Sequence, residues 1–532
     1  MAKPNNNKDK QYDSKERKEE LRKESKQSKN RSRGGSGNAS GKGFSAKKSG
    51  EDKASAGASS RANLFPEDHL LVKDAARISM HNNLGLPLYL NSYMKGTGEK
   101  PAPDSTIGTM IPGIMAFDVI PTYGWSRDWN SALNVAARKI YTFVRHVNSG
   151  KTNYDAANLM MYLLMMDNAF MFHMTLVRVY GFMQTIMLRN RYLPKTLIRS
   201  LGFDYEDLAR NMSDFRAYIN MFAVRLNSMA VPNAMPIYQR HAAMFSSVYA
   251  DSDSDKCQLY VYRPAIRWFF SKDEQKYGLF GERVNYSDPP LSTFRIKEIG
   301  DRIINSLVQE EDWNIMSGDI LHAYGAENLV KLGLIDDNLM LVPEFNREKL
   351  LEIHNTTVML PCSIDAAGSA NFSIYENREV DDPNAGALIA DYNLFLTGHD
   401  DNSVASVDRV IDMMDFEPSP ANVMLATRMA AIASIDEEAG NGNLDCMGSE
   451  IVCMATVYQG TATDGTPMRG STGVPSMWYF FDWAPIWYYT REHEGGKFSV
   501  TFAGSITNAS VVSKQSLTNM HSVALLRLFG VA

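Results

Sequence analysis

Three acidic residues are spaced like the first ligands of a calcium-binding loop. Asp251, Asp253 and Asp255 occupy alternate positions, but Lys256 stands where the turn glycine of such a loop belongs. Tyr262 stands where its bidentate glutamate belongs. We therefore interpret this segment as a solvated loop and predict no metal site there.

A pair of neighbouring aspartates is the second arrangement that could bind metal. Asp400 and Asp401 resemble the doubled aspartates of viral RNA polymerases, but His399 precedes them where that turn has glycine. A two-metal site also needs carboxylates from separate strands, and no upstream carboxylate motif stands out. We expect Asp400 and Asp401 to stabilise the start of the segment beginning near Ser403.

No nucleophile or phosphate-binding loop accompanies these acids. Gly465 and Gly470 have the outer spacing of a phosphate-binding loop, but Ser471 replaces its lysine. The ten histidines stand singly, and no Ser-His-Asp or Cys-His spacing marks an active site. The sequence therefore predicts no enzyme, no cofactor and no metal. Histidines at a subunit contact could still switch assembly between about pH 5 and 7.

The densest aromatic cluster lies at 477–489 and contains Trp478, Trp483 and Trp487. Such side chains can stack on bases, but they also dominate protein cores and subunit interfaces. Asp482 stands among them and would repel phosphate, and no Lys or Arg is interleaved. We therefore predict that the three tryptophans lie in a core or an interface.

Basic residues are concentrated at the start of the chain. Residues 1–62 carry 17 Lys and Arg against 8 Asp and Glu, a net charge of +9, which leaves 38 basic and 53 acidic residues, a net of −15, in 63–532. Residues 1–62 form a basic arm. This arm has few large apolar side chains, so we expect it to be disordered when alone. Its cations would neutralise RNA phosphates independently of base sequence. The residues predicted to bind RNA are Lys8, Lys10, Lys15, Arg17, Lys18, Arg22, Lys23, Lys26, Lys29, Arg31, Arg33, Lys42, Lys47 and Lys48.

The composition of the arm changes along its length. Residues 8–33 are rich in Lys, Arg and Glu and could become helical, whereas residues 34–60 have the composition of a flexible linker. Apolar residues begin near Asn63, where we expect a protease-sensitive junction. No RRM, KH, zinc-finger or dsRBD pattern is found, so RNA should be bound for its charge alone.

The four cysteines of the chain indicate where it resides. Cys257, Cys362, Cys446 and Cys453 are too few and too scattered for a disulfide scaffold. No apolar segment typical of a secretory signal follows the first residues. The sequence therefore predicts a protein that stays in the cytoplasm where it is made.

The body, residues 63–532, is predicted to be mainly α with minor β. Its clearest helix covers 154–189, is apolar on nearly every face and should be buried. Asp167, His173 and Arg178 interrupt its apolar runs, so we predict a core helix and no stable membrane insertion. Helices are predicted within 126–190 and at 291–309, 318–334, 347–354, 404–414 and 419–436, and strands at 258–261, 450–458 and 497–503. Prolines that mark boundaries between segments predict an insertion at 246–418, which lies between the body segments 63–245 and 419–532.

The whole arrangement resembles the capsid proteins of picobirnaviruses. The resemblance rests on the Lys/Arg/Ser/Gly arm, the Met-rich helical body and the Trp-rich segment near the end. Two stretches add to it, I-A-D-Y-N-L-F-L-T-G-H-D at 389–400 and Y-F-F-D-W-A-P-I-W-Y-Y at 479–489. Partitivirus coat proteins are similar in organisation only.

The resemblance implies a helical shell domain with a protruding domain, which would be the insertion at 246–418. Symmetric dimers would close a T=1 icosahedral shell around double-stranded RNA, in virions that assemble in the host cytoplasm. The partners would be further copies of the chain and viral RNA of any sequence. Two alternatives stay open, an RNA-binding nucleoprotein that forms no shell and a viral nucleic-acid enzyme.

Overall fold

The computed structural model describes part of the chain. It covers residues 87–91, 106–110 and 113–531, with gaps at 152, 186–192, 253–256, 273–276, 285, 287–288, 359–361, 364–371, 397–406, 416, 437–440, 462–466, 470–482, 494–496 and 505. The predicted arm, Asn63 and the segment 399–401 therefore lie outside the described residues, as do 253–256 of the calcium-like segment and 465–466 and 470–471 of the phosphate-loop segment.

The described helices are α4 (Ala132–Val147), α5 (Ala156–Gln184), α6 (Leu193–Ser200), α7 (Tyr205–Arg210), α8 (Met212–Leu226), α9 (Ile237–Ser246), α10 (Thr293–Val308), α11 (Glu311–Tyr324), the 3-10 helix η1 (Ala326–Asn328), α12 (Arg347–His354), α13 (Pro420–Ala426) and α14 (Lys514–Leu528). The described strands are β1 (Pro87–Asn91), β2 (Thr106–Met110), β3 (Ile114–Pro121), β4 (Tyr249–Ala250), β5 (Leu259–Pro264), β6 (Ile266–Ser271), β7 (Gly278–Arg283), β8 (Cys362–Ser363), β9 (Phe372–Glu376), β10 (Leu388–Leu396), β11 (Arg409–Asp412), β12 (Ile432–Asp436), β13 (Asn441–Cys446), β14 (Glu450–Thr461), β15 (Pro467–Arg469), β16 (Trp487–His493), β17 (Lys497–Ala503) and β18 (Ala509–Val512).

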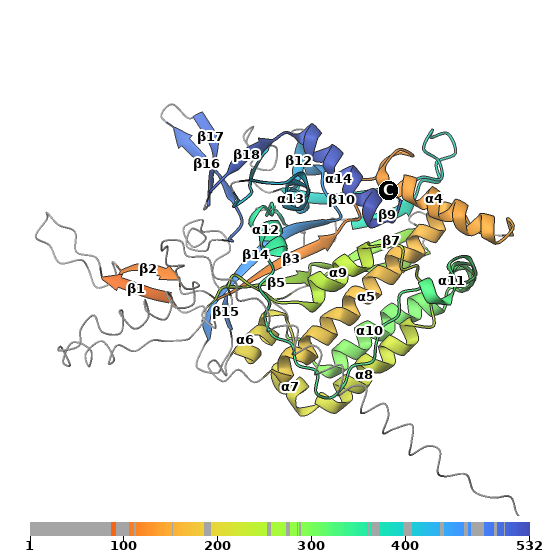
Figure 1. Cartoon of the computed structure of the whole chain (residues 1–532), viewed down its shortest axis with the longest axis horizontal. Coiled ribbons are helices and arrows are strands. Elements are labelled where there is room, and N and C mark those ends of the chain that lie inside the picture. Colours follow the sequence, from red (N-terminus) through yellow and green to blue (C-terminus); the bar gives the residue numbers. More distant parts are fainter. Residues whose placement is uncertain are drawn as a thin grey trace, which may run out of the picture. The chain divides into compact units, whose positions relative to one another are not determined.

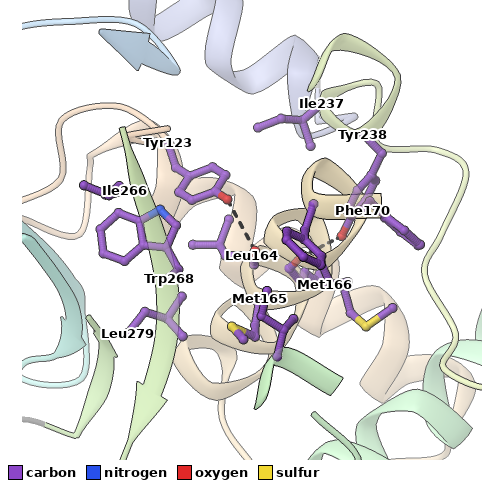
Figure 2. Close-up of a cluster of buried hydrophobic side chains, with 14 of the residues drawn as sticks. Tyr123, Leu164, Met165, Met166, Phe170, Ile237, Tyr238, Ile266, Trp268 and Leu279 are labelled. Atoms are coloured by element: carbon purple, nitrogen blue, oxygen red, sulfur yellow. Dashed lines mark hydrogen bonds between the residues drawn. The ribbon is translucent and has the colours of Figure 1, made fainter. Parts of the chain in front are cut away.

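Helix α5 is the core helix that the sequence predicts. Asp155 caps its start by accepting a hydrogen bond from the backbone N–H of Asn158 (2.9 Å). It is long and apolar enough to cross a membrane by composition, but 89% of its most apolar stretch is buried inside the protein. Figure 2 shows Tyr123 donating a hydrogen bond to the carbonyl of Leu164 in α5, beside Trp268. Buried carbonyls of α5 thus bind side chains of neighbouring elements.

The five-stranded sheet has the order β15-β14-β3-β5-β4 and is covered on both faces. Every residue of β3 is buried, as expected for a strand with protein on both sides. Its alternate residues enter two different apolar clusters: Ile114, Ala116 and Ile120 belong to the larger one, and Met115, Phe117 and Val119 belong to the other. The polar member, Asp118, forms an ion pair with Arg263 of the neighbouring parallel strand β5.

A second sheet crosses the predicted boundary between 246–418 and 419–532. Its order is β12-β13-β10-β9-β7-β6, with β8 paired to β10, so strands from 246–418 and 419–532 share it. The five-stranded sheet likewise joins β3, β5 and β14 from all three predicted segments. The described part of 246–418 therefore shares its sheets with the flanking segments. Its assignment as the protruding domain stays a prediction, because protrusion is a property of the assembled particle.

Most predicted helices are found, but strands are more numerous than predicted. The predictions at 154–189, 291–309 and 347–354 correspond to α5, α10 and α12. The prediction at 318–334 is wrong beyond Tyr324, because Gly325 ends α11 with a φ of +78°. The helix predicted at 404–414 is wrong where it is described, since Arg409–Asp412 forms β11 and pairs with β18. The segment 419–436 divides into α13 and the strand β12.

Candidate assembly sites and the buried ionic network

The residues predicted to contact RNA have no described position. All fourteen arm cations, from Lys8 to Lys48, lie outside the described residues. Their role stays a prediction that rests on charge.

Two of the three predicted tryptophans lie against the five-stranded sheet. Trp487, the first residue of β16, is 8% exposed and packs in the apolar cluster that contains Phe117. Trp483 is partly buried against the same cluster, and its ring stands nearly perpendicular to that of His354, with centroids 6.5 Å apart. Trp478 lies outside the described residues. A side chain as buried as Trp487 offers no face for a base to stack on.

A network of buried charges connects helices α5, α9 and α12 with the start of strand β14. Arg240 of α9 donates to both oxygens of Glu450 at the start of β14, at 2.8 and 2.7 Å. It also donates to Glu352 of α12, with both oxygens at 3.1 Å from Nη1. Lys349 donates to Glu352 from the other side (3.1 Å). The side chains of Arg240, Glu352 and Glu450 are at most 7% exposed.

His241 extends the network into α5. Its Nδ1 lies 2.5 Å from Asp167 of α5, and its Nε2 lies 3.0 Å from Glu450. Burial by itself lowers the pKa of His241, but Asp167 and Glu450 outweigh it and raise the pKa to about 9. For Glu450, burial favours a higher pKa, yet Arg240 and His241 hold that pKa well below its ordinary value. Arg240, Lys349 and His241 thus contact the three carboxylates of Asp167, Glu352 and Glu450.

The contacts of His241 leave neither of its ring nitrogens available to a nucleophile. Both imidazole nitrogens of His241 contact carboxylates, and the hydroxyl of Ser449 donates to Glu450 (2.5 Å) and not to the imidazole. The arrangement therefore activates no nucleophile. Sequence reasoning missed this network, although the charged Asp167 within an apolar helix signals that a buried partner must exist.

Buried histidines bear on the predicted pH switch. Burial lowers the pKa of His173 and of His521 to about 4, whereas His241 has its pKa raised to about 9. None of these three changes charge between about pH 5 and 7. A switch in that range would have to use other histidines.

The raised pKa of His241 predicts a loss of stability at alkaline pH. Because the folded pKa of about 9 lies above the ordinary 6.5, the stabilisation is complete below about pH 6.5 and is lost as pH rises through 9. We expect the urea midpoint of wild-type protein to fall from about pH 7 to 10. His241→Asn should be less stable at pH 7 and should show a flatter dependence. Equal slopes for the two proteins would contradict the assignment.

Apolar side chains are exposed on α8 and on the segment 329–345 that runs beside it. Asn220 of α8 and Asn227, which follows the end of α8, each donate to and accept from this segment, at Ile335 and Leu332, with distances of 2.8 to 3.1 Å. Leu334, between the two bonded positions of this segment, is 63% exposed, and Met221 (45%) and Val224 (58%) are exposed between Asn220 and Asn227. Exposed apolar side chains that gather in this way are typical of protein-protein contacts.

The described residues thus hold a buried ionic network and exposed apolar side chains, and they include no group of acids, histidines and cysteines that could hold a metal. The sequence matches the family model described as "Picobirnavirus, Capsid protein" over residues 67–466. It is 28% identical over 463 residues to a capsid protein precursor of a human picobirnavirus, covering 79% of this chain and 82% of that protein. Its fold matches the crystal structure of the picobirnavirus capsid with a TM-score of 0.72 and 19% identity, covering 88% of this chain and 98% of that one.

These findings define a viral capsid protein, which is a structural protein and not an enzyme. The chain belongs to the picobirnavirus capsid protein family. The resemblance inferred from the sequence is thereby confirmed.

Proposed function

We propose that the protein assembles from symmetric dimers into a closed T=1 icosahedral shell and packages double-stranded RNA through its basic arm. Membership of the capsid family over 67–466 carries this proposal. The contact surface formed by Met221, Val224 and Leu334 supports association of copies, because such side chains gain from burial against a second apolar surface. Assembly would take place in the host cytoplasm, with the arm on the RNA side of the shell.

The division of charge supports the role of the arm. A net charge of +9 on residues 1–62 attracts phosphates, whereas the −15 of residues 63–532 repels them. Contacts of this kind release counterions and weaken steeply with added salt. They require no defined arm conformation and no base sequence.

Replacing the fourteen arm cations with glutamine tests the proposal in the full-length chain. We expect closed particles by negative-stain microscopy, as for wild type, but with most of the nuclease-protected RNA lost. Deletion of residues 1–62 should give the same result. RNA content would be measured from the absorbance ratio of purified particles after a salt wash.

Two outcomes would contradict the proposal. Variant particles with undiminished, salt-resistant RNA would show that the arm is not the RNA-binding element. Wild-type protein that coats RNA as open filaments and never closes would instead favour a nucleoprotein.

A further inference from the structure

Helix α4 carries an unusual concentration of positive charge. It contains Arg138, Lys139, Arg145 and His146 and no acidic residue. All four side chains are exposed, on a body whose net charge is −15. This face differs from the rest of the body in the sign of its charge.

The basic face borders a groove of about 750 Å³. Its walls are α4, Tyr324 at the end of α11, and Gly530 and Val531 near the end of the chain. Figure 1 shows the C-terminal end beside α4, and Lys139 donates to the carbonyl of Val531 (2.9 Å). The lining includes Arg138, Lys139 and His146 and contains no acidic side chain.

The cations of α4 are not neutralised by carboxylates. Arg138 donates to the carbonyl of Trp129 (2.7 Å) and lies 5.3 Å from the centre of its ring. No ion pair joins Arg138, Lys139, Arg145 or His146 to an acid of the described residues. The carbonyls of Trp129 and Val531 orient Arg138 and Lys139 without neutralising the positive charge of either side chain.

A hollow on α10 shows the opposite arrangement. Like the α4 groove, it is lined by an exposed phenylalanine, Phe294, and by two cations, Lys297 and Arg302, but its lining also includes the acidic Glu298 and Asp301. There Lys297 pairs with Asp214 (2.6 Å) and Arg302 pairs with Glu282. Its cations are therefore already neutralised, and it provides a matched control surface.

Aromatic rings complete the α4 groove. Phe143 is 44% exposed, and its ring lies 4.9 Å from that of Tyr324, tilted by 56°. Exposed aromatic rings beside cations are the pattern by which proteins hold unpaired nucleotides, with bases stacking on the rings and phosphates binding the cations. A paired base inside a duplex cannot reach such a ring.

We propose that the α4 groove binds single-stranded RNA. Phosphates would contact Arg138, Lys139 and His146, and a base would stack on the exposed ring of Phe143, next to Tyr324. This inference rests on the proposed role of RNA as the cargo and adds a second, structured contact to it. The arm binds any polyanion by charge, whereas the groove distinguishes unpaired from paired RNA.

The test uses full-length, dissociated protein and two probes, a fluorescent oligouridylate and an RNA duplex of the same length. At raised salt, where purely ionic arm contacts are weakened, Phe143→Ala and the double variant R138Q/K139Q should bind oligouridylate about tenfold more weakly. Duplex binding should change less. The matched variants F294A and K297Q/R302Q should bind both probes like wild type.

A second readout locates the contact directly. Oligouridylate containing 4-thiouridine should cross-link to the peptides that hold Phe143 or Tyr324, as identified by mass spectrometry. Phe143→Tyr keeps the ring and should restore binding and cross-linking, which separates a stacking role from a loss of folding.

Three results would overturn the inference. One is equal loss of binding in the α4 and α10 variants. Another is binding by wild type without any cross-link to α4 or Tyr324, which would leave the arm as the only RNA contact. The last is that F143A alters sedimentation of the protein but not RNA binding, which would make a second copy the occupant. If wild type binds neither probe at raised salt, the groove proposal fails, and only a further absence of binding at low salt would contradict the proposed function of the arm.

Discussion

Replacement of Arg240 with methionine is expected to lower the free energy of unfolding by about 3–5 kcal/mol. The guanidinium holds two buried carboxylates, those of Glu352 and Glu450, which are almost fully shielded from water. Methionine fills similar space but leaves both carboxylates without their main partner. An unpaired buried charge costs far more than the pair contributes. Urea denaturation of the dissociated protein would measure the loss.

Arg302→Met provides the control for this experiment. Arg302 pairs with Glu282, but both side chains are about half exposed, so the loss should stay below about 1 kcal/mol. The triple variant R240M/E352Q/E450Q should recover much of the stability that R240M loses, because it removes the uncompensated charge. Equal, small losses for R240M and R302M would contradict a buried network.

Truncation of Trp487 to alanine is expected to cost about 3–5 kcal/mol. The ring is buried against the five-stranded sheet in the cluster with Phe117, so alanine loses its transfer energy and leaves a cavity. The variant should misfold or fail to form particles. Microscopy and thermal denaturation would check both results.

Phe502→Ala is the matched aromatic control. Phe502 lies opposite Tyr488 on the paired strand β17 and is 43% exposed, so its truncation should change stability by about 0.5 kcal/mol or less. A base-stacking role for Trp487 predicts the reverse pattern for W487A, namely intact particles that lack RNA. That result would overturn the placement of this ring in a core.

The helices could be predicted where their signals are local. Helix α5 is apolar on nearly all faces, and Asn346 caps α12 by accepting from the backbone N–H of Lys349 (3.2 Å). Strand β11 escaped prediction because Arg409–Asp412 is a short segment whose partner, β18, begins at Ala509. Strand pairing of this kind depends on residues far away in the chain, and no local pattern encodes it.

The sequence by itself determined the charge of the arm, the core helix and the resemblance to picobirnavirus capsid proteins, because composition and periodicity are properties of neighbouring residues. Only the tertiary structure decided which charges are paired. Lys297 and Lys139 are both lysines on helices, yet one lies 2.6 Å from Asp214 and the other donates to a backbone carbonyl. Arg240 and Glu450, 210 positions apart, likewise meet only in the fold. Coulomb energy depends on distance and on exclusion of water, and folding sets both.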